Sequence, residues 1–66
     1  MEYIFDRITV DDGLCNGQPT IRGLRITVKT VLEFLLNDTP RDEILKQYPI
    51  LEPEDLNACE RFALNN

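Results

Sequence analysis

The amino-acid sequence predicts a single small, mainly α domain in which three helices follow a short β region. Its 66 residues are enough for one domain at most, and a chain of this size gains only marginal stability as a monomer. Apolar residues recur at helical spacing in three segments, at about 28–37, 40–48 and 53–64. Residues 3–27 instead carry β-branched, aromatic and turn-forming types, which indicates a strand and a hairpin.

The first part of the β region, residues 3–10, is predicted to form one strand. Ile8 and Val10 lie on one phase of the alternation, whereas Tyr3 and Phe5 lie on the other, so the strand either contains a bulge or packs on both faces. A strand with no obvious partner nearby is also a candidate for pairing with a second subunit. We therefore expect a dimer or partner interface at Tyr3, Phe5, Ile8 and Val10, with Phe34 adding apolar surface from the first helix.

A tight hairpin is predicted at residues 21–26. Glycine at the first central position is what a type II′ turn requires, so we place Gly23-Leu24 at its centre. Arg22 and Arg25 then lie opposite each other, which is mildly destabilising for like charges. Either an anion or a carboxylate-bearing partner comes between them, or both side chains point into water.

Capping residues define the three helices. Thr27 precedes the first helix, whose apolar stripe is Val28, Val31, Leu32, Leu35 and Leu36. Thr39 is the expected cap of the second helix, with Pro40 at its first helical position. Pro53 starts the third helix after Glu52, a poorer cap. In that helix we expect a buried side of Leu56, Cys59, Phe62 and Ala63 and an exposed side of Glu54, Asn57, Ala58, Arg61 and Asn65.

The charge is negative overall but unevenly spread. A net charge of −5 argues against nonspecific affinity for nucleic acid, which depends mostly on neutralising phosphates. Residues 13–32 nevertheless contain no acidic residue and carry Arg22, Arg25 and Lys29. A small acidic chain with one basic segment suggests a protein that works through macromolecular partners.

Composition also narrows the class of protein and its location. No apolar run reaches membrane-spanning length, and the N-terminus lacks the basic and apolar regions of a signal peptide, so we expect a cytoplasmic protein. With no histidine and only Cys15 and Cys59, the chain alone offers no zinc site, and we expect no metal or cofactor. Neither a P-loop nor a nucleophile–base arrangement is present, so we expect neither catalysis nor a small-molecule substrate.

Two short helices separated by a tight turn at residues 49–51 match the helix-turn-helix pattern, which also occurs in proteins that never touch DNA. More specific are three ordered runs: Ile8-Thr9-Val10-Asp11, Cys15-x-Gly17-x-Pro19-x-Ile21-Arg22-Gly23-x-Arg25-Ile26 and Ile44-Leu45-x-x-Tyr48-Pro49-x-Leu51-x-Pro53-Glu54-Asp55-Leu56. On these residues the chain closely resembles, over roughly residues 7–63, the short bacterial and archaeal proteins catalogued as domain of unknown function 433. That family looks like the antitoxin halves of Vap-type toxin–antitoxin pairs.

The resemblance implies a homeodomain-like helix-turn-helix bundle, a homodimer, and a toxin partner with a PIN-like ribonuclease fold. It also implies binding to the operon's own promoter. Asn16 and Gln18 stand where the family often has glycine and lysine, which removes one basic residue.

Two functional hypotheses follow, and both can hold through opposite faces. On charge alone, binding to a basic protein partner ranks first, because an acidic surface complements a protein that normally receives RNA. DNA binding ranks second, because the third helix begins with two acidic residues, which phosphates would repel. An acidic helix face that is simply exposed to water explains the composition of this helix equally well. The alternative to an antitoxin is a dimeric interaction module or transcriptional regulator without a toxin. The residues expected to contact DNA are Arg22, Arg25, Lys29, Arg41, Asn57 and Arg61.

Overall fold

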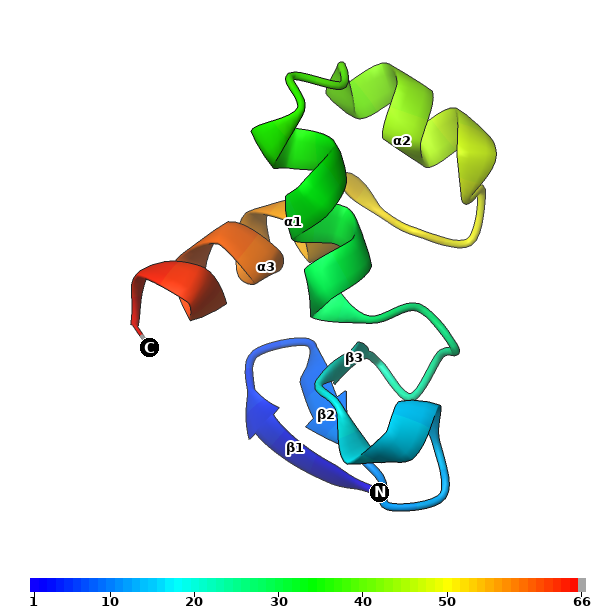
Figure 1. Cartoon of the computed structure of the whole chain (residues 1–66), viewed down its shortest axis with the longest axis vertical. Helices are drawn as coiled ribbons and strands as arrows, with labels where there is room; N and C mark the ends of the chain where they lie inside the picture. Colours follow the sequence, from blue (N-terminus) through cyan, green and yellow to red (C-terminus); the bar gives the residue numbers. More distant parts are fainter. Residues whose placement is uncertain (66) are drawn as a thin grey trace.

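The computed structural model describes residues 1–65 as a three-stranded antiparallel sheet followed by three helices (Figure 1). The sheet is formed by β1 (Glu2–Phe5), β2 (Ile8–Val10) and β3 (Thr20–Ile21), in the order β1-β2-β3, with a short 3-10 turn at Cys15–Gly17 between β2 and β3. The helices are α1 (Val28–Leu36), α2 (Arg41–Gln47) and α3 (Pro53–Leu64). None of these helices is long and apolar enough to cross a membrane.

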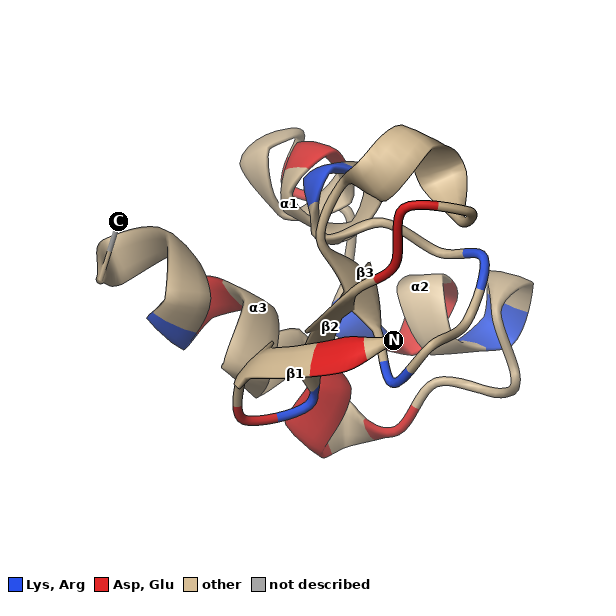
Figure 2. Cartoon of the chain, turned by 90° about the horizontal axis from the view of Figure 1, so that it is seen from below, with Lys and Arg blue, Asp and Glu red and all other residues tan. Residues whose placement is uncertain are grey.

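The expectation of a single strand at residues 3–10 is wrong, because this segment folds back on itself as the hairpin β1–β2. The chain reverses at Asp6-Arg7, where Arg7 has a φ of 63°, and the pairing register shifts between Tyr3 and Phe5. The reversal and the shift account for the broken alternation in the sequence. This hairpin brings its turn beside the acidic start of α3 (Figure 2).

The second turn lies one residue earlier than predicted. The amide of Leu24 donates to the carbonyl of Ile21 at 2.8 Å, so the central residues are Arg22-Gly23, with φ values of 47° and 73°. Two successive positive φ angles define a type I′ turn rather than type II′, with glycine at the second central position. Arg22 therefore adopts a left-handed conformation that is uncommon for a non-glycine residue. The hydrogen bonds of the Arg22 side chain to α3 hold its backbone in this conformation.

Helix starts agree with the prediction for α1 and α3 but not for α2. The hydroxyl of Thr27 accepts a hydrogen bond from the amide of Thr30 at 3.1 Å and so caps α1. Helix α3 begins at Pro53 as expected. The predicted cap at Thr39 is wrong: α2 begins at Arg41, Pro40 occupies the capping position, and no side chain caps this helix.

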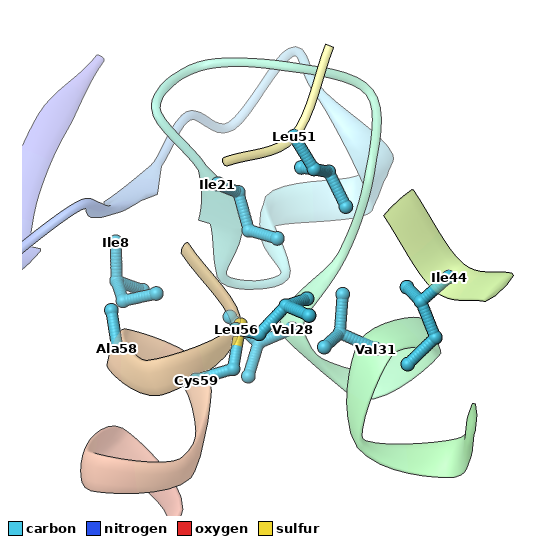
Figure 3. Packing of buried hydrophobic residues seen from close by; sticks show 9 residues of the cluster. All are labelled: Ile8, Ile21, Val28, Val31, Ile44, Leu51, Leu56, Ala58 and Cys59. Carbon is cyan, nitrogen blue, oxygen red and sulfur yellow. The ribbon is translucent and has the colours of Figure 1, made fainter. Parts of the chain in front are cut away.

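The core lies between the sheet and the helices, with Ile8 and Ile21 of the sheet facing apolar residues of α1 and α3 (Figure 3). Three expectations about side-chain placement are wrong. Ala63, predicted on the buried side of α3, is exposed. Ala58, predicted on the exposed face of α3, is fully buried, because α3 contacts both α1 and β2. Leu36, predicted on the buried stripe of α1, is 82% exposed. The buried cluster is Ile8, Ile21, Val28, Val31, Ile44, Leu51, Leu56, Ala58 and Cys59.

Candidate partner-binding surface

Two arginines from the two turns of the sheet converge on one buried carboxylate, that of Asp55 in the first turn of α3. Arg22 makes a bidentate contact with this carboxylate: its Nε donates to Oδ1 at 3.0 Å and its Nη2 donates to Oδ2 at 2.9 Å. Arg7 donates from Nη1 to Oδ1 at 2.9 Å and to Glu52 Oε1 at 2.7 Å. The amide of Glu52 donates to Oδ2 at 2.8 Å. We call Arg7, Arg22, Glu52 and Asp55 the Asp55 cluster.

The Asp55 cluster is a structural ion-pair network that joins the sheet to α3. Asp55 is fully buried, and burial alone raises the pKa of a carboxyl group. Hydrogen bonds from Arg22, the Glu52 amide and Arg7 outweigh burial and hold the pKa of Asp55 below its ordinary value. The same contacts raise the pKa values of both arginines, with hydrogen bonding to Glu52 leading for Arg7 and to Asp55 for Arg22. Both arginines are also held at positive φ, so the network fixes two backbone turns.

Most of the residues predicted to contact DNA are already engaged within the chain. Arg22 is held by Asp55 and by the carbonyl of Ile50, to which Nη2 donates at 3.0 Å. Arg41 forms an ion pair with Glu60 and donates to Asn57 Oδ1 at 3.1 Å. Arg61 forms an ion pair with Asp6 of the β1–β2 turn, to which its Nη2 donates at 3.2 Å.

The two remaining predicted DNA contacts, Arg25 and Lys29, are exposed and form no ion pair within residues 1–65. They lie at the N-terminal end of α1, where the helix dipole adds positive potential. The two acidic residues at the start of α3, which were expected to repel phosphates, differ in exposure. Glu54 faces solvent, whereas Asp55 is buried in the Asp55 cluster.

The five residues predicted at a dimer or partner interface have different environments. Ile8 lies in the core of its own chain and offers no exposed surface. Phe5 and Phe34 are half-buried and make edge-to-face contacts, the first with Phe62 of α3 at 5.6 Å and the second with Tyr48 at 6.1 Å between ring centroids. Val10 is half-buried, and Tyr3, on the edge strand β1, is 58% exposed.

An apolar groove lies between α1 and α3, and the sequence analysis did not predict it. A hollow of about 490 Å³ is lined by Gln18, Pro19, Val28, Lys29, Leu32, Glu33, Leu36, Phe62 and Ala63. A second hollow of about 280 Å³ shares Leu32, Leu36 and Ala63 with it and adds Leu35, Glu60 and Leu64. We call the two together the α1–α3 groove. The signal that could have found it is that both helices keep apolar residues to their last turn.

The described part of the surface carries an apolar groove and no metal-binding cluster. No group of three or more histidine, cysteine, aspartate or glutamate side chains within residues 1–65 is placed to hold a metal ion. The groove between α1 and α3 is apolar and has exposed leucines at its edge. Fold and surface together define a small domain in which a three-stranded sheet carries three helices and α1 and α3 form an open groove.

Comparison with known proteins identifies the family. The model for DUF433, a protein family of unknown function, matches residues 8–63, so the chain belongs to that family. The crystal structure of a DUF433 member protein from Anabaena variabilis ATCC 29413 is similar, with a TM-score of 0.84 and 37% sequence identity. The match covers 91% of this chain but 59% of that longer one. Comparison with curated proteins gives no match.

Proposed function

We propose that this chain is the antitoxin-like component of a type II toxin–antitoxin pair and that it neutralises a ribonuclease toxin with a PIN-like fold by binding to it. The observation that carries the proposal is the distribution of charge. Within residues 1–65, every arginine except Arg25 forms an ion pair. Several exposed carboxylates of the helical part form no ion pair with any described residue: Glu33, Asp38, Asp42, Glu43 and Glu54.

A surface with unpaired carboxylates and few free cations favours a positively charged partner. A ribonuclease must attract the phosphates of RNA, so its substrate-binding surface is basic. Opposite surface charges speed association and suppress wrong partners. The exposed apolar groove between α1 and α3 supplies the apolar contact area that a stable protein complex requires.

The proposal is tested by co-expression with the protein encoded by the adjacent reading frame. We expect a stable complex to co-purify. We also expect the ribonuclease activity of the neighbouring protein to fall as this chain is added, and to reach zero when the two proteins are present in the molar ratio of the complex. Failure to co-purify, or activity that this chain leaves unchanged, contradicts the proposal. A complex with a neighbour that has no ribonuclease activity points instead to a small interaction module or regulator without a toxin.

Binding to operator DNA is a second proposal, and Arg25 and Lys29 favour it because both are exposed and unpaired within the described residues. A homodimer with a helix-turn-helix at α2 and α3 would double these contacts. The affinity for promoter DNA should then fall with salt, with a log–log slope of about −0.9 for each phosphate contact. Exchange of Arg25 and Lys29 for alanine should flatten that slope, and an unchanged slope would remove this second function.

A further inference from the structure

We propose that the α1–α3 groove is the docking site for an amphipathic helix of the partner protein. In this arrangement an apolar side chain of the partner enters the hollow, and its lysine or arginine residues lie at the C-terminal end of α1. The inference rests on the proposed function, because it assigns the place and chemistry of the contact with the partner.

The apolar part of the argument comes from the two leucines at the edge of the α1–α3 groove. Leu36 ends α1 and is 82% exposed, and Leu64 ends α3 and is 86% exposed, so they are the two most exposed large apolar side chains described. Both line the second hollow, and Leu36 also lines the larger one. A groove with apolar walls between two helices is a recurring receptor for the apolar face of a third helix.

Charge gives the occupant a sign and a direction. Glu33 lines the larger hollow and forms no ion pair with the part of the chain that the structure describes, and Asp38 follows the end of α1. Helix α1 has no basic residue in its last turn, so the negative end of its dipole is also uncompensated there. Among the described residues that line the larger hollow, the one cation is Lys29, which lies one helical turn before Glu33, toward the start of α1. The Leu36 end of the groove is therefore the negative end, and the partner's basic residues belong there.

The same charges disfavour a second copy of this chain as the occupant. Each copy has a net charge of −5. Pairing two α1 helices in parallel would set the Glu33 and Asp38 carboxylates of both copies side by side, and in any orientation two chains of the same net charge repel each other. A basic partner turns the same carboxylates into favourable contacts.

The test compares variants of the full chain for binding to the protein encoded by the adjacent reading frame, by titration calorimetry. Leu36→Arg and Leu64→Arg place a cation in the groove, and their exposure makes both tolerable for folding. Each should weaken binding by about tenfold or more, because the new cation faces the partner's basic residues and like charges at an interface are costly. The matched control is Ile50→Arg, because Ile50 is also exposed, at 58%, but lies outside the groove; its affinity should equal that of the wild type. Glu33→Lys should also weaken binding and reduce its salt dependence.

Each outcome separates the inference from the proposed function. If the complex forms and the leucine variants bind like the wild type, the docking site lies elsewhere, while the proposed function stands. If no complex forms, both fail. If Leu36→Arg instead converts a dimer of this chain alone into a monomer, measured by light scattering, the occupant is a second copy and the inference is wrong. If Glu33→Lys binds as tightly as the wild type, the assignment of charge is wrong.

Discussion

Replacement of Asp55 by alanine should be the most destabilising single change within the Asp55 cluster, the buried network that joins the sheet to α3. The carboxylate accepts four hydrogen bonds: one from Arg7, two from Arg22 and one from the Glu52 amide. Removing one partner from a buried ion pair costs about 3–5 kcal/mol when the other charge stays buried. Both arginines are partly exposed and can regain water, so the expected loss lies at the low end, about 3 kcal/mol.

A loss of that size is large for a chain of 66 residues, whose total stability is of the order of 3–10 kcal/mol. The midpoint of thermal unfolding should fall by about 12–24 °C, followed by circular dichroism. The matched control is Glu54→Ala, which removes the neighbouring exposed carboxylate and should cost less than about 0.5 kcal/mol. Equal losses for Asp55→Ala and Glu54→Ala would refute the view that the Asp55 cluster holds the fold together.

Three further predictions concern pH, thiol reactivity and backbone conformation. The pKa of Asp55 in the folded chain lies below its ordinary value of about 3.9, so the stabilisation that this carboxylate gives is present at neutral pH and is lost as the pH falls below about 4. The difference in unfolding free energy between the wild type and Asp55→Ala, measured in urea, should therefore shrink below about pH 4. Burial raises the pKa of the Cys59 thiol to about 12, so a thiol reagent at pH 8 should modify Cys15 in the folded chain and Cys59 only after unfolding, and equal rates would contradict this. Thr27→Ala should lower the free energy of unfolding by about 1 kcal/mol, because it removes the cap of α1. Gly23→Ala should lower it by at least as much, because Gly23 has a positive φ. A variant of either kind that unfolds in urea at the same free energy as the wild type would refute the local geometry described for that residue.

Local sequence signals predicted the elements whose causes are local. Thr27 caps α1 and Pro53 starts α3 because capping depends on residues within one helical turn. The apolar spacing of the three helices placed them within a residue or two of their observed bounds. The broken alternation at residues 3–10 did indicate an irregularity, but periodicity alone could not distinguish a bulge from a reversal of the chain.

The candidate site was less predictable because its contacts are distant in sequence. Arg7 and Arg22 reach Asp55 across 48 and 33 residues, and no local pattern marks such a pair. Arg22 therefore looked like a free surface cation. The exposure of Leu36 likewise depends on where α3 crosses α1, which the helical stripe of α1 does not determine.

The most direct test of the central claim is an amide chemical-shift map of this chain on addition of the protein encoded by the adjacent reading frame. If the chain works by docking a basic protein in the α1–α3 groove, the largest shifts should fall on the second half of α1 and the last turn of α3, with Arg22 and Asp55 unmoved. Shifts concentrated at Arg25 or on the sheet, with the residues that line the α1–α3 groove unmoved, would contradict the account.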